Sequence, residues 1–232
     1  MKGFYSDREA DAYREECASF LRTGKIIYQR INTDYMEDYV HPRSHDKELR
    51  TQRIYQYLHN HKGDSVAQFL NRAIGLRNQI EEAWLTDLIY RREKETLQSY
   101  VIVTHYLQDR GMLQKHRDYS GPAPFPLIQF WVLLSRPEID YKRGNLVLYS
   151  KSDRRYRVEG DLGVKKGDVV IFDKSLLHEV EVTEPSESST GRWTVLIGAR
   201  ARRDSYWQAC YKKLYYGRRF YELRRARKSF SH

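Results

Sequence analysis

Apolar residues in the first part of the chain recur every three or four positions, which is the spacing of a helix that buries one face. One helix is predicted over residues 6–23, where Ser6 and Glu9 form a capping-box pattern at its start. A second, longer helix is predicted over residues 64–92, with an apolar stripe that continues along its length. Two amphipathic helices therefore precede the rest of the chain.

The stretches beside these helices are more polar. We expect a strand over residues 25–32, and a short helix is one option over residues 49–58. His59 and His61 have the spacing of metal ligands, but they lie in a polar stretch before a helix. For this reason we expect both side chains on the surface.

From Leu97 onward the pattern changes to short apolar runs separated by Gly, Pro and Asp, which is typical of β-strands. Eight strands are predicted, over residues 100–106, 113–118, 127–134, 145–149, 156–158, 169–172, 178–182 and 193–199. Many short strands with closely spaced turns favour a sandwich, a barrel or a jelly roll.

No linker-like stretch divides the chain, so we predict a single domain over residues 1–232, mainly β with flanking helices. Its parts are an N-terminal helical support that is also a candidate lid (1–96), a β-core (97–200) and a basic C-terminal helix (201–232). A length of 232 residues with 40% hydrophobic residues is enough for one sizeable core.

The chain lacks an apolar run long enough to cross a membrane and lacks the apolar stretch of a signal peptide. The two cysteines, Cys17 and Cys210, match no metal-binding spacing, and we expect free thiols. A cytoplasmic protein without a membrane span is the resulting expectation.

The formal net charge is +10, and residues 200–232 alone contribute +9. Basic residues interleaved with aromatic ones are typical of surfaces that bind nucleic acid or membranes. The alternative is an amphipathic helix whose aromatic residues pack on the core or on a second subunit. We favour the alternative, so nucleic-acid binding is not expected, and a homodimer through this helix is one option.

Candidate chemistry centres on His116 and Asp118, which are two residues apart on a predicted strand. Because side chains alternate along a strand, both would point to the same face. His178, at the start of a later strand, is the third candidate ligand. Two histidines and one carboxylate suit non-haem Fe(II) with three positions left open, although zinc accepts the same ligands.

Arg192 and Thr194 are also two residues apart on one predicted strand. A guanidinium beside a hydroxyl suits the binding of a carboxylate, such as the distal carboxylate of 2-oxoglutarate. Gln129 either faces this site or, if it shares a face with Trp131, belongs to the core.

The order His116-x-Asp118, His178, Arg192-x-Thr194 resembles the Fe(II)/2-oxoglutarate-dependent dioxygenases, over roughly residues 97–200. Tyr106, in addition, resembles the strand tyrosine that contacts 2-oxoglutarate in the prolyl-4-hydroxylase-like branch. The segments Gly144-Asn-Leu and Gly167 to Phe172 resemble strands of the same branch. The resemblance implies a double-stranded β-helix, which is a cupin-like jelly roll. It also implies iron on the two histidines and Asp118, and 2-oxoglutarate on Arg192, Thr194 and Tyr106.

The activity implied by the resemblance is hydroxylation of an unactivated C–H bond with O₂, which converts 2-oxoglutarate to succinate and CO₂, with ascorbate as a candidate stimulant. No peptide- or nucleic-acid-reading module is evident, so the expected substrate is a small molecule, such as an amino acid or a metabolite derived from one. A protein or peptide hydroxylase, a desaturase or cyclase, and a non-enzymatic jelly-roll binding module stay open as alternatives.

Departures from the motifs of related families disfavour some of the activities known in this superfamily. Animal and algal prolyl hydroxylases anchor the co-substrate with Lys, where this chain has Arg192. Nucleic-acid demethylases carry Arg-x-Asn-x-Thr-x-Arg, whereas Arg192 is followed by Trp-Thr-Val-Leu. The carboxylate of Asp118 also argues against a halogenase, which has a small residue at that position.

Overall fold

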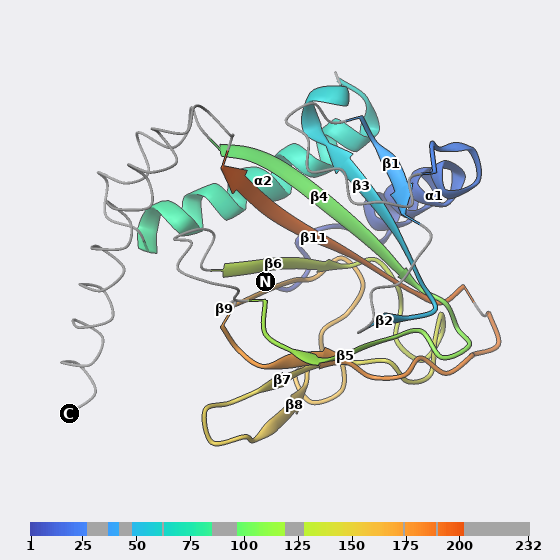
Figure 1. The fold of residues 1–232 in the computed structure, drawn as a ribbon, viewed down its shortest axis with the longest axis vertical. Coiled ribbons are helices and arrows are strands. Elements are labelled where there is room, and N and C mark those ends of the chain that lie inside the picture. Colours follow the sequence, from blue (N-terminus) through green and yellow to red (C-terminus); the bar gives the residue numbers. More distant parts are fainter. Residues whose placement is uncertain are drawn as a thin grey trace.

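Two antiparallel β-sheets face each other in the computed structural model of the protein (Figure 1). The structure describes residues 1–26, 37–41, 48–61, 63–84, 97–118, 128–173, 175–188 and 190–201. Its helices are α1 (Asp7–Thr23), α2 (Ser65–Trp84) and a short 3-10 helix at Leu58–Asn60.

The larger sheet has six strands in the order β1-β3-β4-β11-β6-β9. Their bounds are Tyr39–His41 for β1, Thr51–Tyr57 for β3, Leu97–Tyr106 for β4, Arg192–Ala201 for β11, Ile128–Leu133 for β6 and Val169–Asp173 for β9. The smaller sheet has five strands in the order β2-β5-β10-β7-β8. Their bounds are Glu48–Leu49 for β2, Met112–His116 for β5, His178–Val180 for β10, Leu146–Tyr149 for β7 and Arg155–Arg157 for β8.

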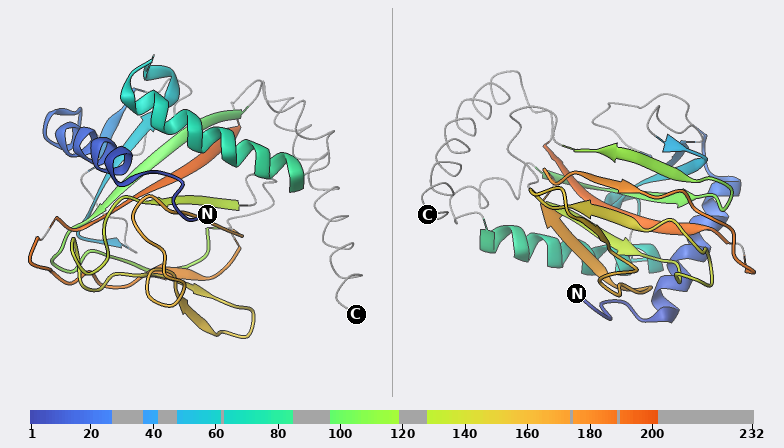
Figure 2. Two further views of the ribbon diagram at one scale, coloured as in Figure 1. Left: turned by 180° about the vertical axis from the view of Figure 1, so that it is seen from behind. Right: turned by 90° about the horizontal axis from the view of Figure 1, so that it is seen from below.

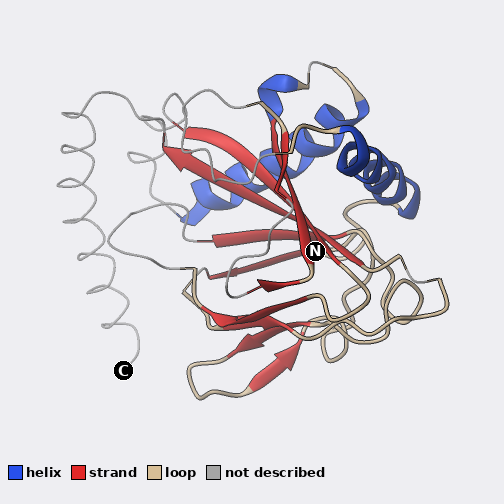
Figure 3. Cartoon of the chain, turned by 45° about the vertical axis from the view of Figure 1, so that its right-hand side comes forward, coloured by secondary structure: helices blue, strands red, loops and turns tan. Residues whose placement is uncertain are grey.

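The two faces of the larger sheet have different partners. On the outer face, Val103, Phe130 and Val195 pack in one buried cluster with side chains of α1 and α2. Figures 2 and 3 show both helices on this side of the larger sheet. On the inner face, residues of the larger sheet such as Trp131 pack with Leu146 of the smaller one. Helices outside and a closed apolar interior between the sheets make a jelly roll, which confirms the predicted fold class.

The local patterns located most elements correctly. All eight predicted strands of the β-core are present, with bounds that differ by a few residues. Helix α1 begins after Ser6, and the predicted capping box with Glu9 is formed. Helix α2 begins as predicted and is described as far as Trp84. The end of this predicted helix, most of the predicted strand over residues 25–32, and residues 202–232 of the predicted C-terminal helix lie outside the described residues.

The suggested short helix over residues 49–58 is wrong, because this segment forms the end of β2 and all of β3. In β3, Tyr55 pairs with Tyr39 of β1 on one side and with Ile102 of β4 on the other. The Tyr39 and Tyr55 rings stack with centroids 4.7 Å apart. Pairing on both sides satisfies the backbone of β3 and outweighs the weak helical spacing. The N-terminal part of the chain thus supplies strands as well as helices.

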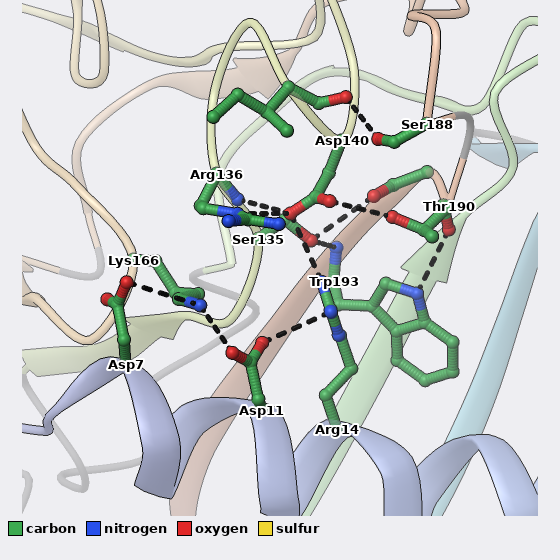
Figure 4. A network of polar contacts seen from close by, with 12 residues as sticks. Asp7, Asp11, Arg14, Ser135, Arg136, Asp140, Lys166, Ser188, Thr190 and Trp193 are labelled. Atoms are coloured by element: carbon green, nitrogen blue, oxygen red, sulfur yellow. Dashed lines mark hydrogen bonds and ion pairs between the residues drawn. The ribbon is translucent and has the colours of Figure 1, made fainter.

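A buried polar network joins α1 to the loop before β11 (Figure 4). The Asp140 carboxylate is almost completely buried and accepts hydrogen bonds from Arg14 at 3.1 Å and from the Thr190 hydroxyl at 3.0 Å. The Ser135 hydroxyl donates to the Gly191 carbonyl oxygen and accepts from the Trp193 N–H. These contacts fix the position at which β11 begins, between Gly191 and Trp193.

His61 is half-buried and lies between two carboxylates. Its Nε2 is 2.6 Å from Asp38 Oδ2, and its Nδ1 is 2.9 Å from Asp64 Oδ2. Asp64 also caps α2 by accepting the Ala67 N–H. The hydrogen bond to Asp38 and, more weakly, the contact with Asp64 raise the pKa of His61 to about 9, although partial burial opposes the shift.

The His61 cluster predicts a pH-dependent contribution to folding. Because the pKa of His61 is raised above its unfolded value of about 6.5, the contribution is complete below that pH and is lost as the pH rises through about 9. Solvent screening limits it to roughly 1–2 kcal/mol. Denaturant unfolding of wild-type protein and His61→Gln between pH 6 and 10 checks this. A stability difference that does not shrink over that range would contradict it.

None of the described helices has a stretch long and apolar enough to cross a membrane.

Candidate active site

The three predicted metal ligands meet where two inner strands of the smaller sheet, β5 and β10, end and begin. His116 ends β5 and His178 begins β10, and the two are directly paired across these antiparallel strands. Their ring centroids are 4.3 Å apart. The candidate ligand atoms of His116, Asp118 and His178 all lie within 4.8 Å of one another.

Asp118 reaches this cluster from outside the strand. Strand β5 ends at His116, so the alternation rule that predicted the shared face does not extend to Asp118. The carboxylate nevertheless lies 3.3 Å from Nε2 of His116 and 3.5 Å from Nε2 of His178. The loop that follows β5 therefore completes the cluster.

Backbone carbonyls orient both imidazoles. Nδ1 of His116 is 2.7 Å from the Gln114 carbonyl oxygen, and Nδ1 of His178 is 2.9 Å from the Leu176 carbonyl oxygen. A carbonyl only accepts, so each Nδ1 carries the proton and each Nε2 is directed toward Asp118. Two ring nitrogens facing one carboxylate require protons or a metal cation between them.

Burial by itself would raise the pKa of Asp118, but hydrogen bonds with His116 and His178 lower it well below the usual range. The Gln129 amide adds a further hydrogen bond to Asp118 Oδ2. Gln129 lies on β6 and is buried, on the same face as Trp131. Gln129 therefore faces the site. It also shares a face with Trp131, because that face of β6 borders the interior that contains the site.

Removing the Gln129 amide is expected to weaken metal binding at this cluster. In Gln129→Leu, Asp118 loses a donor that holds its carboxylate, and such outer contacts typically change metal affinity by about 10- to 100-fold. Titration of the protein with Fe(II) or Mn(II) measures the change. Gln114→Leu, an exposed position on β5, is the control. Equal affinities in the two variants would show that the Gln129 contact does not support metal binding.

Arg192 and Thr194 lie on the inner face of the larger sheet, as the spacing predicted. Arg192 is directly paired with Tyr106 of β4, and Thr194 with Thr104 of the same strand. The Arg192 guanidinium lies 5.2 Å from the Tyr106 ring centroid and 4.8 Å from that of Trp131. All of these side chains are buried.

Gly191 allows β11 to start this close to β4. Its φ is +77°, and a Cβ atom at this position would lie 2.6 Å from the Tyr106 carbonyl oxygen. A larger residue would meet both a strained backbone and a clash. The glycine before Arg192 thus helps to place the guanidinium in the interior.

The metal-ligand cluster and Arg192 share one apolar interior. Phe172 contacts the His178 ring edge-on, with centroids 5.3 Å apart. Phe172 also belongs to the buried cluster that contains Tyr106 and Trp131, the two rings that flank Arg192. The metal-ligand cluster and Arg192 are therefore two polar groups on the walls of the same apolar interior.

His105 points to the opposite face of β4 from Tyr106. Its ring stacks on Trp193 at 4.1 Å, and burial lowers its pKa to about 4. Cys17 is a buried free thiol on α1, whereas Cys210 lies outside the described residues. Neither His105 nor Cys17 belongs to the site.

The sequence gives no sign of Glu159, which the structure places against Arg192. Its Oε1 accepts from Nη2 at 2.9 Å and from Nε at 3.2 Å. Burial would lower the pKa of Arg192, but the charge of Glu159, its hydrogen bond and the nearby Tyr141 and Tyr106 together raise it. Nη1 of Arg192 has no hydrogen-bond partner among the described residues, although it is buried. A buried donor without an acceptor fits the carboxylate of a bound co-substrate.

The donor set at the cluster fits Fe(II), because two imidazoles and one carboxylate on one side of an ion leave positions for co-substrate and O₂. A jelly roll with this cluster and a buried arginine is the architecture of the Fe(II)/2-oxoglutarate-dependent oxygenases, and the protein is an enzyme of this class. The chain belongs to the Oxygenase-NA family, whose model matches residues 39–177 and is described as an oxygenase catalysing oxidative methylation of damaged DNA. The match ends one residue before His178.

Solved structures of the same fold include prolyl hydroxylases. A prolyl-4-hydroxylase from Pseudomonas putida has 15% sequence identity and a TM-score of 0.58, with 87% of this chain and 91% of that chain covered. A prolyl hydroxylase from Trichoplax adhaerens, solved with a hypoxia-inducible-factor peptide fragment, has 11% identity and a TM-score of 0.58, with 87% and 82% covered. At these identities the likeness bears on the fold alone. No curated protein sequence matches the chain.

Proposed function

We propose that the protein holds Fe(II) on His116, Asp118 and His178 and uses 2-oxoglutarate and O₂ to hydroxylate an unactivated C–H bond of its substrate. The observation that carries this proposal is the convergence of the three ligand atoms within 4.8 Å, in the same interior as a buried arginine with an unpartnered Nη1. Histidines that only stabilise the fold would not need a buried arginine with an unpartnered donor in the same interior.

Each residue has a distinct part in the proposed reaction. Bound iron supplies redox chemistry with O₂ that the side chains cannot supply themselves. Arg192 donates from Nη1 to the distal carboxylate of 2-oxoglutarate, and Thr194 and Tyr106 line the same face. The apolar residues between the sheets exclude water from the reacting C–H bond.

The proposal is tested by measuring succinate formed from 2-oxoglutarate with Fe(II) and ascorbate. Turnover without substrate is slow in such a reaction but measurable, so the assay does not depend on knowing the substrate. We expect formation of succinate that stops when a chelator removes the metal. Succinate formation that the chelator leaves unchanged would reject the proposal.

For the substrate, our first candidate is a small molecule, such as an amino acid or a metabolite derived from one. It is supported by the small size of the core and by the lack of an evident segment for recognising peptides or nucleic acids. Mass spectrometry of a metabolite extract incubated with the enzyme tests it, as one added oxygen raises a mass by about 16 and loss of two hydrogens lowers it by about 2. A product mass shifted down instead of up would favour the desaturase alternative.

The description of the family supports a second candidate, a damaged base in DNA. The net charge of +10 agrees with a polyanionic partner, whereas the missing Arg-x-Asn-x-Thr-x-Arg pattern speaks against known demethylases. Oligonucleotides with and without a methylated base, in single- and double-stranded form, distinguish the candidates. Succinate formation stimulated only by the methylated oligonucleotide would favour DNA over metabolites. Stimulation by peptides alone would favour a protein hydroxylase.

A further inference from the structure

Arg192 already has a carboxylate partner from the chain itself. The side chains of Arg192 and Glu159 are 0% and 1% exposed, so the ion pair is fully removed from water. Glu159 Oε1 takes the edge of the guanidinium formed by Nε and Nη2. A buried arginine without such a partner would strongly destabilise the fold, because a lone charge in an apolar interior is poorly solvated.

Glu159 is held from its other side as well. Its Oε2 accepts the Leu146 N–H at 2.7 Å, at the start of β7. The Tyr141 hydroxyl lies 3.4 Å from Oε1. Since Glu159 follows β8 and Arg192 begins β11, the ion pair joins the smaller sheet to the larger one. The carboxylate is therefore a fixed part of the interior.

A carboxylate that binds to Nη1 has to share the guanidinium with Glu159. The two anions would sit on different edges of one planar cation, in an interior that screens their repulsion poorly. Because Glu159 already neutralises Arg192, an incoming carboxylate gains hydrogen bonds from Nη1 but gains little net charge attraction.

From this arrangement we infer that Glu159 is an internal counter-anion that neutralises Arg192 in the free enzyme and limits the affinity for the distal carboxylate of the co-substrate. The inference rests on the proposed function. Glu159 is a positioning and affinity-setting residue and does not touch the reacting atoms.

The test compares Glu159→Gln with wild-type protein in calorimetric titrations with 2-oxoglutarate, using Fe(II)-loaded protein without O₂ so that nothing turns over. We expect the variant to bind 2-oxoglutarate about tenfold more tightly, which corresponds to about 1.4 kcal/mol. Succinate, which shares the distal carboxylate, is expected to gain affinity too. Pyruvate has the 2-oxo acid end but no distal carboxylate, so its binding is expected to stay unchanged.

Glu181→Gln is the matched control, because Glu181 also directly follows a strand region of the smaller sheet but pairs with the more exposed Arg155 and Arg157. The new amide of Glu159→Gln cannot accept from both Leu146 and Arg192, so its fold is checked by circular dichroism. Glu159→Met, of similar volume and without charge, serves as the second variant if the first does not fold.

The outcomes separate this inference from the proposed function. Wild-type protein that fails to bind 2-oxoglutarate would overturn both. Wild-type protein that binds it, together with a folded Glu159 variant that binds equally or more weakly, would overturn only the role of Glu159. Equal tightening in Glu181→Gln would also overturn it, because the effect would then be one of overall charge.

Discussion

His116→Ala is expected to abolish the iron-dependent conversion of 2-oxoglutarate to succinate, with a loss on the order of 10³-fold. His116 offers one of three converging ligand atoms, and two remaining ligands would hold the metal weakly. Loss of the metal removes several kcal/mol of stabilisation from the reaction, and each 1.4 kcal/mol is a factor of ten in rate. Succinate formation and Fe(II) binding are measured on the same preparations.

Gln114→Ala is the control for this experiment, since residue 114 lies on the same strand with an exposed side chain. We expect it to retain both metal binding and turnover. The backbone carbonyl of Gln114 that orients His116 is kept in this variant. Wild-type metal affinity in His116→Ala would contradict the proposed ligand set, even if activity were lost for another reason.

Arg192→Met is expected to damage both folding and co-substrate binding. It leaves Glu159 as a buried carboxylate without its cation, and breaking a buried ion pair from one side typically costs about 3–5 kcal/mol. It also removes the Nη1 donor, so the affinity for 2-oxoglutarate is expected to fall by about 10- to 100-fold. Denaturant unfolding and anaerobic titration measure the two effects separately.

The double variant Arg192→Met/Glu159→Gln separates the loss of stability from the loss of 2-oxoglutarate binding. With neither charge present, most of the lost stability is expected to return, because no ion is left unpaired in the interior. Binding of 2-oxoglutarate is expected to stay weak, since the anchoring donor is still missing. Full recovery of binding in the double variant would mean that Arg192 does not anchor the co-substrate.

Much of this architecture follows from local patterns. The eight strands of the β-core and the start of both helices depend on spacing, capping and turn residues within short windows, as with Ser6 and Glu9. The residues His116, Asp118 and His178 were also evident, because metal ligands belong to few residue types and their order along the chain is informative. The division into a single domain with a basic C-terminal helix stays a prediction.

Other features depended on pairing between distant elements. The short apolar pattern of β3 also allows a helix, and only the pairing with β1 and β4 on both sides makes it a strand. The polar surroundings of His61 in the sequence do not indicate its ion pair with Asp38, which lies 23 residues earlier in the chain. In both cases the neighbours that decide the outcome lie outside any local window.

The sequence by itself determined a β-rich core, which the family resemblance narrows to a jelly roll. It also determined the three candidate ligands and the arginine, because few residue types bind a metal or a carboxylate. Only the tertiary structure decided how these residues are supported. Gln129 reaches Asp118 across 11 residues, and Glu159 meets Arg192 across 33 residues, from the opposite sheet. Which inner faces oppose each other is set by the packing of the two sheets, and period-two alternation along one strand carries no information about the strand it will face.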